Sequence, residues 1–105
     1  MNNWQIVDYL FPGGIGRHPA VIVSNAARAA NKPSLEILRC GTQRATRQAG
    51  PGEVILDAAD GLDWKTLCFC DLIWMVDRDD VKNARGNVTL PRRGAVVRAI
   101  LQSHE

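Results

Sequence analysis

An arginine and a histidine stand side by side where a glycine-rich loop meets an apolar run. The run itself, residues 19–24, is rich in β-branched side chains, and Arg17 and His18 directly precede it. A histidine exchanges its proton near neutral pH, so it can act as a general acid or a general base. Neighbouring residues of an extended segment point to opposite sides, so we expect Arg17 and His18 to face different sides of a strand. The alternative is a histidine with no catalytic role at a loop-to-strand junction.

A carboxylate interrupts the apolar segment that runs from residue 67 to residue 76. Alternation along a strand places Asp71 on the same side as Phe69 and Ile73. Burial among such neighbours would raise the pKa of the Asp71 carboxyl unless a cation paired with it. The candidate partners are Arg17, Arg39 and Arg78. Asp71 is therefore a candidate for a catalytic role or for a structural ion pair.

Basic side chains gather in one part of the chain, although the formal net charge is only +2. Residues 17–52 hold six basic side chains against the single Glu36, whereas residues 53–80 hold eight acids against two bases. Arg44 and Arg47 lie in a polar loop, where two guanidinium groups could bind consecutive phosphates or stack on the bases of single-stranded RNA. The same charge would suit an acidic peptide, and an ordinary solvated loop is the bland alternative.

The size and composition predict one globular domain over residues 1–105, with 46% hydrophobic and 23% charged residues. The N-terminus has no basic stretch followed by an apolar run, and no segment approaches the roughly 20 apolar residues of a membrane span. We therefore expect a cytoplasmic protein. Cys40, Cys68 and Cys70 are odd in number and lack zinc-site spacing, so we expect buried small side chains and neither metal nor cofactor.

Alternating and β-branched segments predict strands, which breaker residues separate. The expected strands are residues 4–10, 19–24, 34–42 and 53–56, with two more to follow. In the segment 67–76, Cys68, Cys70, Leu72, Trp74 and Val76 are expected on one face. Residues 25–31 are rich in alanine and predict one short helical turn. The glycine of the turn 57–61 supplies a left-handed exit.

The chain is expected to close with an amphipathic helix. Thr89 is a good N-cap, Pro91 fits the first turn, and the expected apolar stripe consists of Leu90, Val97, Ile100 and Leu101. Arg92, Arg93 and Arg98 are assigned to the solvated face. Together these elements predict a mainly β protein, an SH3-like small barrel of coiled antiparallel strands with a C-terminal α-helix.

Four short motifs resemble those of the PemK/MazF-like toxins, in the same order. Residues 16–24 resemble the second-strand signature, which usually reads Gly-x-Arg-Pro-x-Val-Val-Ile/Leu-Ser. The others are residues 39–43, the Cys70-Asp71 step with residues 76–78 after it, and the Gly86-x-Val88 step before the final helix. This resemblance covers nearly the whole chain and implies the SH3-like fold of that family.

The resemblance also implies a function. Members of this family are type II toxin-antitoxin endoribonucleases, homodimers that cleave single-stranded RNA without metal and are neutralised by a cognate antitoxin. The implied catalytic residues are His18, Arg17, Thr42 and Asp71, and the implied RNA-binding residues are Arg39, Gln43, Arg44 and Arg47. For Thr42 the alternative is a strand-end hydroxyl that satisfies a turn.

The chain departs from the family pattern at catalytic positions. His18 stands where the family has its principal arginine, the loop before it contains no acid, and Phe69 replaces an arginine found in some members. A catalytically inactive PemK-like module that binds RNA, an antitoxin peptide or a gyrase-type target is therefore the second hypothesis.

Overall fold

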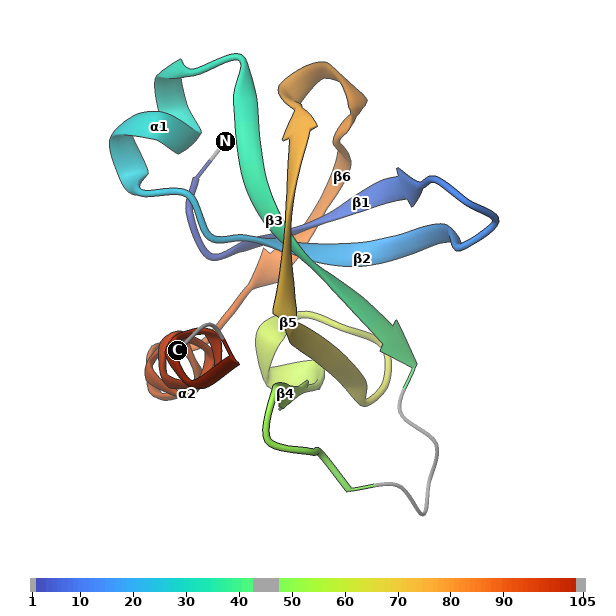
Figure 1. The fold of residues 1–105 in the computed structure, drawn as a ribbon, viewed down its shortest axis with the longest axis vertical. Coiled ribbons are helices and arrows are strands. Elements are labelled where there is room, and N and C mark those ends of the chain that lie inside the picture. The colour runs from blue at the N-terminus through green and yellow to red at the C-terminus, as the bar shows by residue number, and fades with distance from the viewer. Residues whose placement is uncertain (1, 43–47, 104–105) are drawn as a thin grey trace.

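The computed structural model describes residues 2–42 and 48–103 and forms one curled antiparallel sheet with helices beside it (Figure 1). The described strands are β1 (Gln5–Phe11), β2 (Gly16–Ile22), β3 (Ser34–Thr42), β4 (Glu53–Leu56), β5 (Thr66–Asp77) and β6 (Lys82–Asn87). Their order across the sheet is β4-β5-β3-β2-β1-β6. The helices are α1 (Ala26–Asn31) and α2 (Leu90–Ser103), with single 3₁₀ turns η1 (Ala58–Asp60) and η2 (Arg78–Asp80). The predicted mainly β fold with a C-terminal helix is confirmed.

Two hydrophobic clusters use opposite faces of the same strands. On β2, Val21 belongs to the first cluster, whereas Ala20 and Ile22 belong to the second, as strand alternation requires. Helix α2 contributes Val96 to the first cluster and packs against β4 and β5. Helix α1 contributes Ala29 to the second. The curled sheet therefore has apolar side chains packed on both faces.

Strand β5 changes its inward face half-way along, so the predicted single face is wrong. Cys70 packs in the first cluster and Val76 in the second. A register shift between Leu38 and Cys40 of β3 interrupts the pairing with β5 at this point. Such an irregularity bends a strand and re-aims its side chains. Asp71 lies in the interrupted part, where it has apolar neighbours as predicted but is exposed.

Helix α2 begins after Thr89 as predicted, but it buries a different stripe. Val96 and Ala99 are buried, whereas Leu90 is 75% exposed and Leu101 is 64% exposed. Of the expected stripe, Ile100 packs against the first cluster. The outward apolar residues are spaced at helical intervals too, so helical periodicity alone could not show which stripe faces the sheet.

Arg92 joins α2 to the turn before β5, which corrects its assignment to a solvated face. Its guanidinium contacts Asp57 Oδ1 at 2.6 Å and also binds Asp60. Asp60 is buried and accepts a hydrogen bond from the Thr89 backbone at 2.9 Å. The hydrogen bond from Arg92 lowers the pKa of the Asp57 carboxyl to about 2. Gly61 has φ +93°, the left-handed exit expected after this turn.

The three cysteines are buried and free. Cys40 pairs directly across the sheet with Cys68, and Cys70 lies two residues farther along the same strand. A hydrogen bond with the Cys68 thiol, together with burial, raises the pKa of the Cys70 thiol far above its usual range. These side chains therefore behave as small apolar groups, as predicted. Within the described ranges, no helix is long and apolar enough to cross a membrane.

Candidate functional site in a notch between two strands

Strands β2 and β3 pair over a short stretch and then separate, as Figure 1 shows. Ala20 pairs with Arg39, and Ile22 pairs with Ile37. Residues 16–19 continue on β1, whereas residues 40–42 continue on β5. Beside the part of β2 that is not paired with β3 lies a cavity of about 230 Å³, here called the notch, which is lined by Arg17, His18, Pro19, Trp64, Thr66 and Arg85.

His18 lies on β2 opposite Tyr9, at the edge of the notch. Its Nε2 is 3.0 Å from the carbonyl oxygen of Ile15. A carbonyl oxygen can only accept a hydrogen bond, so Nε2 must carry a hydrogen. In the neutral ring the proton-accepting nitrogen is then Nδ1.

A second cavity, here called the Arg39 pocket, lies on the same side of the sheet as the His18 side chain. Because Ala20 pairs with Arg39, the side chain two residues before Ala20 points to the same face as Arg39. The pocket has a volume of about 370 Å³ and is lined by Ile15, Arg39, Phe69, Asp71, Leu72 and Trp74. Ile15 is common to this pocket and to the hydrogen bond of His18. The pocket therefore adjoins the histidine.

Arg39 and Asp71, two of the predicted site residues, line the Arg39 pocket together. The guanidinium carbon of Arg39 lies 4.5 Å from the centre of the Phe69 ring, a cation–π contact that holds the cation over the ring. Arg78, one of the partners considered for Asp71, instead donates from Nε to the Lys32 carbonyl oxygen at 2.9 Å. The exposed Asp71 carboxylate therefore has one arginine of the three beside it.

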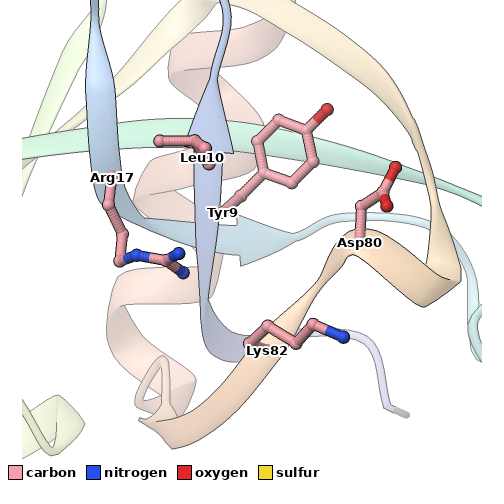
Figure 2. A pocket seen from close by; sticks show the side chains of 5 residues that line it. All are labelled: Tyr9, Leu10, Arg17, Asp80 and Lys82. Atoms are coloured by element: carbon pink, nitrogen blue, oxygen red, sulfur yellow. The ribbon is translucent and has the colours of Figure 1, made fainter.

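Arg17 points to the other side of β2 from His18, as predicted. It pairs with Leu10 of β1 and lines both the notch and a further cavity of about 280 Å³. Figure 2 shows this further cavity, with Arg17 and Leu10 on one side of β1 and the Tyr9 ring on the other. Asp80 and Lys82 complete its lining. Arg17 thus reaches the notch from the side opposite to the Arg39 pocket.

The remaining predicted site residues are at the end of β3 and beyond it. Thr42 is the last residue of β3, and its backbone pairs with Thr66, which lines the notch. Gln43, Arg44 and Arg47 lie outside the described residues. Their predicted roles in RNA binding stay predictions.

Trp64 and Arg85 also line the notch, and the sequence reasoning missed both. Trp64 stands between two charged residues in a polar stretch, a setting that could have marked it as an exposed aromatic side chain. Arg85 carried no such signal, because its position depends on the pairing of β6 with β1. Its Nε lies 2.7 Å from Oδ1 of the buried Asp8. Among the described residues, no group of three or more His, Cys, Asp or Glu side chains could hold a metal ion.

Comparison with solved structures gives the fold a known counterpart. An endoribonuclease in complex with its cognate antitoxin from a mycobacterial species superposes with a TM-score of 0.82 at 24% identity, over 99% of this chain and 94% of that one. The Mycobacterium tuberculosis toxin MazF-mt6 gives a TM-score of 0.80 at 17% identity, over 95% of both chains. The chain has the fold of the MazF toxins.

The likeness extends to a complex of MazF with MazE. The MazE-MazF structure from Deinococcus radiodurans gives a TM-score of 0.73 at 18% identity, over 97% of this chain and 92% of that one. No family model matches the chain, and neither does any curated protein sequence. The MazF fold is thus kept in a chain whose sequence has diverged far from these structures.

Proposed function

We propose that the chain is the toxin of a type II toxin-antitoxin pair, an endoribonuclease that cleaves single-stranded RNA without a metal ion. The observation that carries this proposal is His18, which lines the notch together with Arg17 and Arg85 and whose Nδ1 is the proton acceptor of the neutral ring. The fold supports it, since one similar structure is named an endoribonuclease with its cognate antitoxin and another a MazE-MazF complex.

The reaction is an attack by a ribose 2′-OH on the adjacent phosphate. Nδ1 of His18 takes the proton of the hydroxyl as the bond between the 2′-oxygen and phosphorus forms. The bond from phosphorus to the 5′-oxygen breaks, and that oxygen receives a proton. The products are a 2′,3′-cyclic phosphate and a 5′-hydroxyl. Negative charge builds up on the phosphate oxygens on the way, so nearby cations lower the barrier.

The cations and hydroxyls around the notch suit that charge. Arg17 and Arg85 line the notch, and Arg39 lines the adjoining pocket together with Asp71. Thr42 ends β3, where its backbone pairs with Thr66 of the notch lining, and we propose that it helps to bind the same phosphate. Asp71 is exposed, so its carboxylate can contact the bound RNA. There it can orient a nucleobase of the RNA or the Arg39 guanidinium.

The proposal includes partners and a place of action. The toxin acts as a homodimer in the cytoplasm, and an antitoxin with an acidic segment neutralises it. Exposed apolar side chains two residues apart on β5, Ile73 at 39% and Met75 at 67%, support a second copy as partner, because monomers rarely leave contiguous apolar surface uncovered.

The test is incubation of the purified protein with a long single-stranded RNA in the presence of EDTA. We expect discrete fragments that end in 2′,3′-cyclic phosphate, and at least about tenfold slower cleavage by a His18→Ala variant prepared in parallel. The variant excludes a contaminating ribonuclease. RNA that stays intact at high protein concentration would contradict the proposal.

The second candidate is a catalytically inactive module of the same fold. It is favoured by the Phe69 ring, which holds the Arg39 guanidinium, and by the histidine in the place of the family arginine. Inducible expression separates the two candidates. Growth arrest with fragmented cellular RNA indicates the nuclease, whereas arrest with intact RNA indicates a binding module that acts on RNA, an antitoxin peptide or a gyrase-type target.

A further inference from the structure

Trp64 is an exposed aromatic side chain at the mouth of the notch. It lies between η1 and β5 and is 63% exposed, although tryptophan is highly buried on average. Trp4 and Trp74, the other tryptophans, are partly buried against the two hydrophobic clusters. The backbone at Trp64 is held by Thr66, whose hydroxyl donates to the Trp64 carbonyl oxygen at 3.1 Å. An uncovered indole on a held backbone offers a flat surface for stacking.

Two guanidinium groups face the same notch. The ion pair with Asp8 holds Arg85 through Nε, and Asn83 Nδ2 donates to the other Asp8 oxygen at 3.3 Å. The side chain of Arg85 is still 39% exposed, so part of its head group can meet a ligand. Arg17 is exposed and forms no ion pair with any residue of the described ranges. One cation is therefore pre-positioned and the other is unpaired.

The lining of the notch contains no carboxylate and includes His18. A molecule bound in the notch would therefore contact the guanidinium groups of Arg17 and Arg85. It would also lie beside the imidazole of His18. An indole next to guanidinium groups suits a flat heterocyclic ring joined to a phosphate. An acidic peptide would use the cations but gains less from the stacking surface. The notch thus fits a nucleotide better than a peptide.

We propose that the notch binds a nucleotide next to the scissile phosphate, with its base stacked on Trp64 and its phosphate held by Arg17 and Arg85. This inference rests on the proposed RNA cleavage and assigns the substrate strand a second contact, on the side of β2 away from the Arg39 pocket. Because stacking accepts every base, the contact strengthens binding without selecting a sequence.

The test measures binding separately from cleavage. A short 2′-O-methyl oligoribonucleotide lacks the attacking hydroxyl, so it binds without being cleaved. We expect it to quench the tryptophan fluorescence of the wild-type protein. Trp64→Ala should weaken binding about fivefold or more, since stacking on one aromatic ring is worth about that much. Trp64→Phe should keep most of the affinity but lose the quenching.

Leu90→Ala is the matched control, because it shortens another exposed apolar side chain, 75% exposed at the start of α2. Its binding should equal that of the wild type. Trp64→Ala binding as tightly as the wild type would overturn the inference. So would a glutamate-rich peptide that binds in preference to the oligonucleotide and depends on Trp64. If binding depends on Trp64 but no unmodified RNA is cleaved, the nucleotide site stands and the proposed cleavage fails.

Discussion

His18 differs from the arginine of the toxin signature in what it can exchange with a substrate. A guanidinium supplies charge, whereas the imidazole of His18 has a nitrogen that can take up a proton, because Nε2 is engaged with Ile15. The substitution therefore points to a change in how the 2′-hydroxyl is activated rather than to a lost site. The hydrogen bond itself could not be read from the sequence, since it depends on the turn between β1 and β2.

Variants of His18 test this role. His18→Ala should lower the rate of RNA cleavage at least about tenfold, since one positioned acid or base is typically worth a hundredfold or more. His18→Gln is the matched variant, because its amide N–H can still donate to Ile15 but its side chain cannot accept a proton. We expect Gln to be as inactive as Ala in a gel assay of a labelled RNA. Cleavage by His18→Gln at the wild-type rate would exclude proton transfer by His18.

His18→Arg separates charge from proton transfer. It restores the arginine before Pro19 that the toxin signature contains. If His18 acts as the base, this variant should cleave as poorly as His18→Gln, because an arginine does not give up its proton in a protein. Wild-type activity in His18→Arg would show instead that the position supplies positive charge.

At the scale of elements, the local sequence pattern predicted where strands lie better than it predicted which of their side chains point inward. The bounds of β3 and β4 agree with the prediction, because each is a β-forming run between breakers. The face assignment of β5 failed at Asp71, since the irregular pairing with β3 is a long-range property. For the same reason Arg92 was misplaced: its partners Asp57 and Asp60 lie about thirty residues earlier.

The contact between Arg92 and Asp57 should make folding stability depend on acid pH. The pKa of Asp57 is about 2 in the folded protein against an ordinary value of 3.8. Above about pH 4 the carboxyl is ionised in both states, and the stabilisation is complete. As the pH falls toward about 2, the unfolded chain takes up the proton first, so the stabilisation is progressively lost.

Urea unfolding at several pH values checks this expectation. The midpoint of the wild type should fall more steeply between about pH 4 and about pH 2 than that of Asp57→Asn, which has no carboxyl at this position. Asp79→Asn, at an exposed site in η2, should behave as the wild type does. Parallel curves for the wild type and Asp57→Asn would contradict the role of the Arg92 contact.

At the scale of the whole molecule, the site depends on where strands separate. The part of β2 that lines the notch, residues 17–19, comes before Ala20, where the pairing with β3 begins, and the other lining residues come from β6, β5 and the segment before β5. The sequence reasoning therefore pointed to His18 and Arg17, which line the notch, but could not join them to Trp64 and Arg85 across it. The family resemblance identified site residues by their order along the chain. Their proximity in space depends on how the sheet curls.

The other whole-molecule property is an apolar surface that continues from β5 to α2. Ile73 and Ile100 line one cavity, and near them Met75 is 67% exposed and Leu101 is 64% exposed. A second copy of the chain that covers this surface would remove it from water, which is the main favourable contribution to association. The surface thus predicts a dimer formed through β5 and α2.

Met75→Lys should convert this dimer to a monomer. The side chain is exposed, so a lysine leaves the fold of one copy intact but would bury an unpaired charge in the interface. Light scattering after size-exclusion chromatography should give twice the chain mass for the wild type and a single chain mass for Met75→Lys. Leu10→Lys is the matched control, at a site on β1 that is 60% exposed and away from this surface, and it should remain a dimer. A monomeric wild type would contradict the dimer, and a Met75→Lys variant that stays dimeric would move the interface away from β5 and α2.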